Sequence, residues 1–153
     1  ADEKVTVSID RQQLQAVTGA DGKWAVDVRP LKAGGPYTLT VSTEKRKLVY
    51  ENVLAGEVWL CSGQSNMEFY LNWSATAAQD VPQAANSNIR LYDMKARWRT
   101  DAVEWDASVL DSLNHLQYYK DTRWTVCSPE TAGNFSAVAY YSERNCRIVC
   151  KSL

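Results

Sequence analysis

Histidine is almost absent from this sequence, which contains one, His115, among 153 residues. An excess of charge of either sign is also lacking, since the formal net charge is −1 at pH 7. The sequence therefore offers no basic field for the phosphates of nucleic acid. No apolar run approaches the roughly 20 residues that cross a membrane. We therefore expect no nucleic-acid partner and no membrane span, and any signal peptide to have been removed or not included.

Metal-ligand spacing is missing from the cysteines. Cys146 and Cys150 are close in sequence, but no second pair and no histidine lies near them. We expect no metal and no cofactor. Cys61 lies in a run that reads as a buried strand, where a thiol behaves as a small apolar side chain. The pairing of the cysteines and the redox compartment stay open.

Aromatic residues are plentiful, with 6 tryptophans and 8 tyrosines. Such rings suit carbohydrate surfaces, but packing in a core or on a sheet is the favoured interpretation. The same two interpretations apply to Trp59 and Trp73, which flank the candidate nucleophile described below.

The first third of the chain predicts β structure. Residues 4–9 alternate apolar and polar side chains, as do residues 23–28 and 37–41. Asp21-Gly22 is a strong turn signal, and the Gly-Gly-Pro within 30–37 predicts a loop. We expect a small antiparallel sheet with one apolar face, which needs a partner layer.

The pattern changes near residue 56. Residues 58–61 form a continuous apolar run, typical of a strand that is covered on both faces. After Gly63 the sequence becomes compatible with a helix, and 88–94 predicts another short strand. Strand, tight turn, helix and strand together indicate that an α/β unit begins here.

The remaining residues are less regular. Residues 95–121 predict a long irregular connection with a helical turn. Residues 123–128 favour a strand, 129–133 a loop, and the segment from Phe135 to Tyr141 a helix.

Ser65 is the candidate nucleophile. A serine hydroxyl needs a base within hydrogen-bond reach and donors for the oxyanion, and a strand-to-helix turn exposes the oxygen to a substrate. The run "LCSGQSNM" predicts that turn, with Gly63 allowing it to be tight. Gln64 and Asn66 flank the serine and are candidates for orienting it or its substrate. The competing interpretation is that Ser65 only caps the following helix.

The run "GEVWLCSGQSNMEF" (56–69) resembles the first block of the SGNH, or GDSL-type, hydrolases, in the form found in sialate O-acetylesterases. "DGKWAVDVRPLKAGGPYTLTV", "IRLYDM" and "RWTVCSPETAGNFSAVAYY" resemble the same family in the same order. The resemblance implies that Ser65 is the nucleophile and that its backbone N–H is one oxyanion donor. It further implies removal of O-acetyl esters from sialic acid or a related glycan sugar, without a metal, in a secreted, periplasmic or lysosomal location.

The resemblance also implies what is missing. The family's oxyanion Gly and Asn and its Asp-x-x-His pair lie on later blocks, and this sequence stops before them. Ser112 stands where an Asp would precede His115, so His115 does not match that block. We therefore expect the N-terminal portion of the family, weakly active or inactive by itself. A complete hydrolase that uses His115 as its base is a further hypothesis.

The predicted fold class is α/β with a β-rich N-terminal part. An antiparallel β-sandwich-like segment over 1–53 would precede the start of an SGNH-type α/β/α hydrolase layer over 54–141. The tail over 142–153 is atypical, and a frameshift after codon 141 is one hypothesis for it. The alternative function is a non-catalytic, carbohydrate-binding or scaffold β-sheet module. Uncovered sheet edges and apolar faces would favour self-association.

Overall fold

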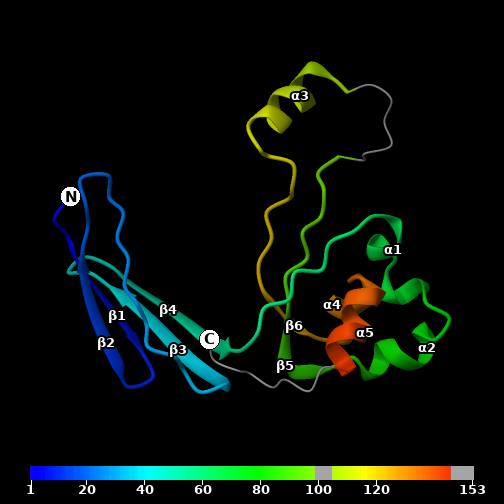
Figure 1. The fold of residues 1–153 in the computed structure, drawn as a ribbon, viewed down its shortest axis with the longest axis horizontal. Helices are drawn as coiled ribbons and strands as arrows, with labels where there is room; N and C mark the ends of the chain where they lie inside the picture. Colours follow the sequence, from blue (N-terminus) through cyan, green and yellow to red (C-terminus); the bar gives the residue numbers. More distant parts are fainter. Residues whose placement is uncertain (99–104, 146–153) are drawn as a thin grey trace. The chain divides into compact units, whose positions relative to one another are not determined.

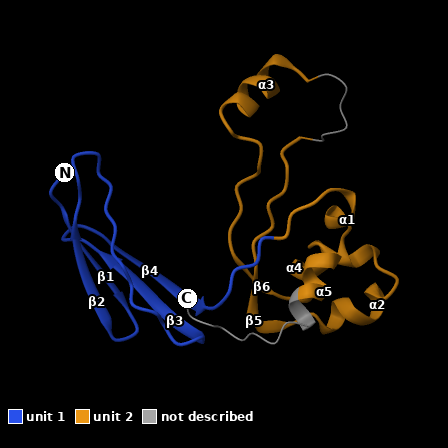
Figure 2. Ribbon diagram, in the orientation of Figure 1, with its two compact units in different colours: residues 1–60, 146–153 blue, residues 61–145 orange. Residues whose placement is uncertain are grey.

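The computed structural model describes residues 1–98 and 105–145. The chain divides into two compact units, with Ala1–Leu60 in unit 1 and Cys61–Asn145 in unit 2 (Figure 2). The fold is mixed α/β, and both of its sheets are antiparallel (Figure 1). The sandwich-like and SGNH layering predicted from the sequence stays a prediction.

Unit 1 is built on a four-stranded sheet with the order β2-β1-β3-β4. Its strands are β1 (Lys4–Ile9), β2 (Gln12–Val17), β3 (Gly34–Ser42) and β4 (Lys47–Ala55). The alternation in β1 buries Val5, Val7 and Ile9, each at most 6% exposed, because successive side chains of a strand point to opposite faces. The predicted strand over 4–9 is confirmed.

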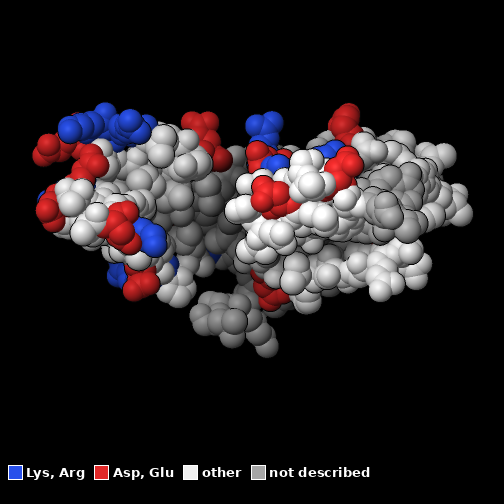
Figure 3. Space-filling model, turned by 90° about the horizontal axis from the view of Figure 1, so that it is seen from above, with Lys and Arg blue, Asp and Glu red and all other residues white. Residues whose placement is uncertain are grey.

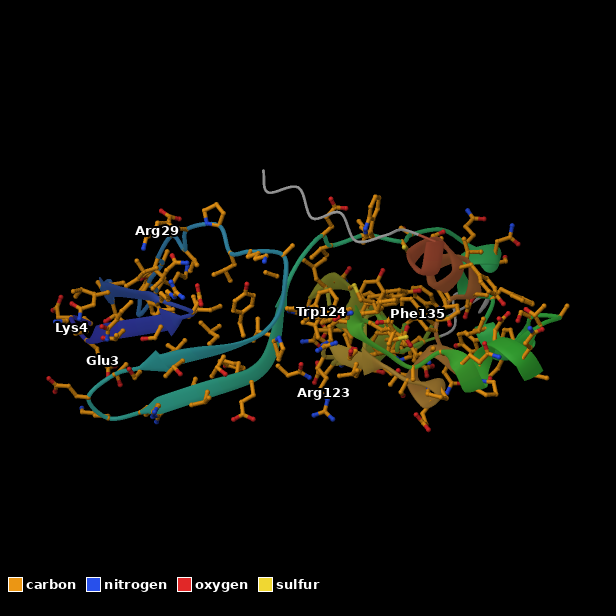
Figure 4. The ribbon with its side chains drawn as sticks, turned by 90° about the horizontal axis from the view of Figure 1, so that it is seen from below. Glu3, Lys4, Arg29, Arg123, Trp124 and Phe135 are labelled. Atoms are coloured by element: carbon orange, nitrogen blue, oxygen red, sulfur yellow. The ribbon has the colours of Figure 1, made fainter. Side chains whose placement is uncertain are left out.

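The turn at Asp21-Gly22 is present, but the strand predicted after it is not. The Gly19 N–H donates to the Lys23 carbonyl at 2.9 Å, and Gly22 has a φ of 77°. Residues 23–28 then form no strand, and Trp24 is 40% exposed. The Gln12 side chain hydrogen-bonds to the backbone N–H and carbonyl of Arg29 at 2.8 and 3.1 Å; Arg29 is labelled in Figure 4. The residue directly after the predicted strand is thus held by a side chain, and residues 23–28 have no backbone ladder.

Unit 2 combines short helices with a two-stranded sheet. Its first elements are α1 (Ser65–Glu68), the 3₁₀ helix η1 (Leu71–Trp73), α2 (Ala77–Asp80), the 3₁₀ helix η2 (Val81–Gln83) and β5 (Asn86–Leu91). The others are α3 (Ala107–Asn114), β6 (Thr125–Cys127), α4 (Pro129–Gly133) and α5 (Ala137–Asn145). The predicted helix after Gly63 is therefore several short pieces.

The core of unit 2 lies between the β5–β6 sheet and the helices α4 and α5. Its fully buried side chains include Leu71, Leu91 and Cys127, and the Cys127 thiol donates to the Ala84 carbonyl at 3.1 Å. Phe135, labelled in Figure 4, packs against this core. The strand predicted within 123–128 and the helix predicted from 135 to 141 are confirmed in β6 and α5.

The apolar run 58–61 departs from its prediction. No strand forms there, and Val58, Trp59 and Leu60 are 76%, 59% and 88% exposed. Cys61 is half-buried and outside a strand. A strand needs a hydrogen-bonded neighbour, and no strand in the described ranges pairs with this segment.

The loop predicted over 129–133 is also wrong, because these residues form α4. The Ser128 hydroxyl accepts from the Thr131 N–H at 3.3 Å, and the Thr131 hydroxyl accepts from the Ser128 N–H at 2.9 Å. This reciprocal capping box, with Pro129 at the first helical position, starts the helix.

The long connection carries the helical turn that the sequence predicted. Residues 95–97 and 118–120 run antiparallel, with bonds from Arg97 N to Tyr118 O and from Lys120 N to Lys95 O. They lead to α3. The atypical tail predicted over 142–153 begins within α5, and residues 146–153 lie outside the described residues.

Candidate active site

Ser65 is the first residue of α1 and is exposed. The position before the helix belongs to Gln64, whose carbonyl accepts from the N–H groups of Met67 and Glu68 at 2.9 and 3.1 Å. Ser65 therefore does not stand at the N-cap position, and the capping interpretation does not account for it. Gly63, Gln64 and Asn66 are exposed around it.

Met67, in α1, has close neighbours at Gly63 and Ser136. An added Cβ at Gly63 would lie 3.1 Å from the Met67 Cβ, so a larger residue there would require a small shift of the turn or of α1. The Ser136 hydroxyl donates to the Met67 sulfur at 3.1 Å. The sequence predicted a role for Gly63, but it contained no signal for Ser136.

The segment after α1 is joined to the segment between α4 and α5. Leu71 N–H donates to the Phe135 carbonyl at 3.0 Å, and Ala137 N–H donates to the Phe69 carbonyl at 2.8 Å. Tyr70 and Ser136 form the antiparallel bridge between these bonds. The helix that carries Ser65 is thus anchored directly to the start of α5.

Aromatic and polar side chains, some exposed and some half-buried, are connected to the segment after α1. We call this group the Trp73 surface, and its members are Phe69, Tyr70, Asn72, Trp73, Lys95 and Asn134. Trp73 is 59% exposed and Phe69 is 42% exposed. Core packing, the favoured interpretation of Trp73 and Trp59 from the sequence, is not what the structure shows for either ring. Asn72, Lys95 and Asn134 carried no signal in the sequence.

His115 lies directly after α3, and no hydrogen bond or ion pair in the described residues joins it to Ser65. Its Nδ1 is 2.8 Å from the Asp111 carbonyl oxygen and 3.6 Å from the Asp111 Oδ1. The side chain is 66% exposed. In the described part of the chain, the polar contacts of this imidazole go to its own helix.

The carboxyl group of Glu130, in the first turn of α4, has a lowered pKa. The Ser128 hydroxyl, 2.6 Å from the Glu130 carboxylate, lowers the pKa of that carboxyl from its ordinary value of 4.5, and a backbone hydrogen bond lowers it further. Acidic and basic side chains lie close together on the face of unit 2 seen in Figure 3. Over residues 1–98 and 105–145, no group of three His, Cys, Asp or Glu could hold a metal ion.

Most of this chain is similar in sequence to proteins of known name. The sialate O-acetylesterase of Rattus norvegicus is 32% identical over 128 residues, which cover 80% of this chain and 21% of the relative. The chain belongs to the sialate O-acetylesterase family. The Homo sapiens sialate O-acetylesterase is 26% identical over 122 residues, which cover 71% of this chain and 23% of the relative. This family member therefore spans about a fifth of the length of the curated relatives that it matches.

A solved structure supports the same assignment. A carbohydrate acetylesterase from Xanthomonas citri superposes with a TM-score of 0.78 at 29% sequence identity, covering 95% of this chain and 31% of that one. A comparison with protein-family models finds no match. None of the helices described here is long and apolar enough to cross a membrane.

Proposed function

We propose that this chain carries the nucleophile of an esterase that removes O-acetyl groups from sialic acid or a related glycan sugar, with Ser65 as that nucleophile. The observation that supports it most is the position of Ser65: exposed, inside the first turn of α1, and not used as a cap. The names of the relatives supply the ester class. A secreted, periplasmic or lysosomal location belongs to this proposal.

The Ser65 hydroxyl oxygen attacks the acetyl carbonyl carbon, and the hydroxyl proton passes to a base. The carbonyl oxygen becomes an oxyanion, to which the Ser65 backbone N–H donates. When the tetrahedral intermediate collapses, the sugar oxygen leaves with a proton, and water then releases acetate from the serine. Gln64 and Asn66, on either side, are proposed to orient the ester.

The described residues supply no clear general base for Ser65. The single histidine of the sequence is held by Asp111 on its own helix. A serine without its base retains only the catalysis that comes from oxyanion donors and binding. We therefore expect the 153-residue chain to form an acetyl-serine slowly and to turn over weakly.

The test is acetylation of the chain by p-nitrophenyl acetate, followed by peptide mapping by mass spectrometry. We expect acetyl groups on Ser65 at least about tenfold above those on other serines, since even a partial site favours its nucleophile. Ser65→Ala should abolish this signal. Ser62→Ala, in the same exposed loop, is the matched control and should leave it unchanged.

Equal labelling of Ser62 and Ser65 would contradict the proposal and favour a non-catalytic module. Adding His115→Ala separates the two catalytic hypotheses. If acetylation of Ser65 decreases in His115→Ala, then His115 is the base. Unchanged acetylation of Ser65 in that variant means that another group is the base.

A further inference from the structure

We infer that the Trp73 surface is the subsite that holds the sugar ring of the ester. This inference rests on the proposed function, since it assigns the part of the substrate that Ser65 does not touch. The proposed ligand is a pyranose ring, whose flat apolar face would stack on the surface while its equatorial hydroxyls form hydrogen bonds.

The aromatic part of the surface is exposed and yet held in place. The Trp73 ring centroid lies 4.4 Å from that of Tyr70 and 6.0 Å from that of Phe69. An indole fixed by two neighbouring rings loses little freedom when a ligand stacks on it, which is the advantage of preorganisation. Despite these neighbours, 59% of Trp73 remains exposed.

The surface also carries two amide side chains, those of Asn72 and Asn134. Asn72 Nδ2 donates to Asn134 Oδ1 at 3.4 Å, and Asn134 Nδ2 donates to the Glu130 carbonyl at 3.5 Å. Both residues are exposed, and each amide keeps donor and acceptor capacity for a hydroxyl. A Cβ at Gly133 would lie 2.8 Å from Asn72 Oδ1, so the glycine makes room for the amide.

Lys95 fixes the surface without giving it a strong charge. Its ammonium nitrogen lies 5.0 Å from the centroid of the Tyr70 ring and 3.4 Å from the Asn134 carbonyl oxygen. The Asp93 carboxylate lies 3.2 Å from the same nitrogen and balances its charge. The surface therefore recognises the ring rather than a carboxylate, and it should accept neutral and anionic sugars alike.

The connection to Ser65 is short and rigid. Phe69 directly follows α1, and Tyr70 and Leu71 are bridged to the start of α5. A sugar ring stacked on Trp73 is thereby held by the same anchored segment that positions the serine.

Binding measured in the Ser65→Ala background tests this subsite separately from catalysis. The probes are an O-acetylated methyl glucoside and an O-acetylated sialic acid, titrated against the indole N–H signals of the chain in NMR spectra. We expect the Trp73 signal to shift, with a Kd of about 1 mM for both probes and a difference between them of no more than about threefold.

Trp73→Ala should weaken binding of both probes about tenfold, as expected of an aromatic anchor. Trp124→Ala is the matched control, since Trp124 is 53% exposed and packs on Tyr92 at 5.1 Å. It should change the Kd less than about twofold. Gly133→Ala, which displaces Asn72, should weaken binding about threefold while the circular dichroism spectrum stays unchanged.

Equal effects of Trp73→Ala and Trp124→Ala, or no binding by about 10 mM, would overturn the assignment. Binding of the sialic acid alone, lost in Lys95→Met, would overturn the ring-based recognition. If Trp73→Ala does not fold, Trp73→Phe and Trp73→Leu replace it, and only the phenylalanine variant should retain binding. Acetylation of Ser65 in wild type without Trp73-dependent binding would refute the subsite and leave the proposed function standing.

Discussion

At the scale of single residues, Gly63 determines how closely the chain turns into the helix of Ser65. The Cβ that alanine would add lies 3.1 Å from the Met67 Cβ, and the Ser136 hydroxyl donates to the Met67 sulfur. Two Cβ atoms cannot turn away from each other as long side chains can. The substitution must therefore shift the backbone of the turn or of α1.

We predict that Gly63→Ala lowers the free energy of unfolding by about 1 kcal/mol, as is typical of overpacking. The same variant should lower Ser65 acetylation several-fold, because the hydroxyl moves with its helix. Chemical denaturation and the peptide-mapping assay measure the two effects. Gly22→Ala is the control, because it alters a turn that is distant from Ser65 in the sequence. We expect normal acetylation of Ser65 in Gly22→Ala and reduced acetylation in Gly63→Ala.

At the scale of elements, α4 shows how little of a short helix is visible in hydrophobic periodicity. The segment Pro129–Gly133 was predicted as a loop from its proline and glycine. Its helix instead depends on side-chain caps, in which Ser128 and Thr131 satisfy each other's backbone N–H groups. The longer patterns of β1 and α5 were predicted correctly, because a whole face of side chains becomes buried there.

We predict that Ser128→Ala destabilises the fold by about 1 kcal/mol through the lost cap. It should also change the pH dependence of stability. The lowered pKa of Glu130 means that its contribution is present above the ordinary value of 4.5 and is lost as pH falls through the lowered one. Since the Ser128 hydroxyl is the main cause, the alanine variant should lose less stability on acidification than wild type.

Urea denaturation at several acidic pH values measures this difference. Glu130→Gln is the control, because it keeps a hydrogen-bond acceptor near Ser128 and does not titrate. An identical pH dependence for wild type and Glu130→Gln would show that the carboxylate contributes nothing.

At the scale of the whole chain, the sequence predicted an antiparallel sheet followed by an α/β unit, and it identified the family through the run around Ser65. It did not predict the bonds between residues 69–71 and 135–137, because pairing across such a separation leaves no periodic signal. The sequence also predicted a buried strand over residues 58–61, where the structure has an exposed segment. Local apolarity indicates that a segment can be buried, but burial itself requires a partner layer.

That run leads to a prediction about association. Val58, Trp59 and Leu60 are exposed in series, and contiguous exposed apolar side chains promote contact between copies. Sedimentation velocity should show the wild-type chain associating with rising concentration. Leu60→Lys should shift it toward monomer. Leu116→Lys, which alters another highly exposed leucine (90%), should not, and a strictly monomeric wild type would contradict the prediction.

The anchor between α1 and the start of α5 also determines when the site can be assembled. Met67 and Ser136 are separated by 69 positions in the sequence, and contacts between distant positions form only after the chain between them has been made and ordered. During synthesis, therefore, Ser65, the proposed nucleophile, leaves the ribosome long before the segment that holds its helix. The position of its helix is therefore a late product of folding, acquired only when residues 135–137 have docked.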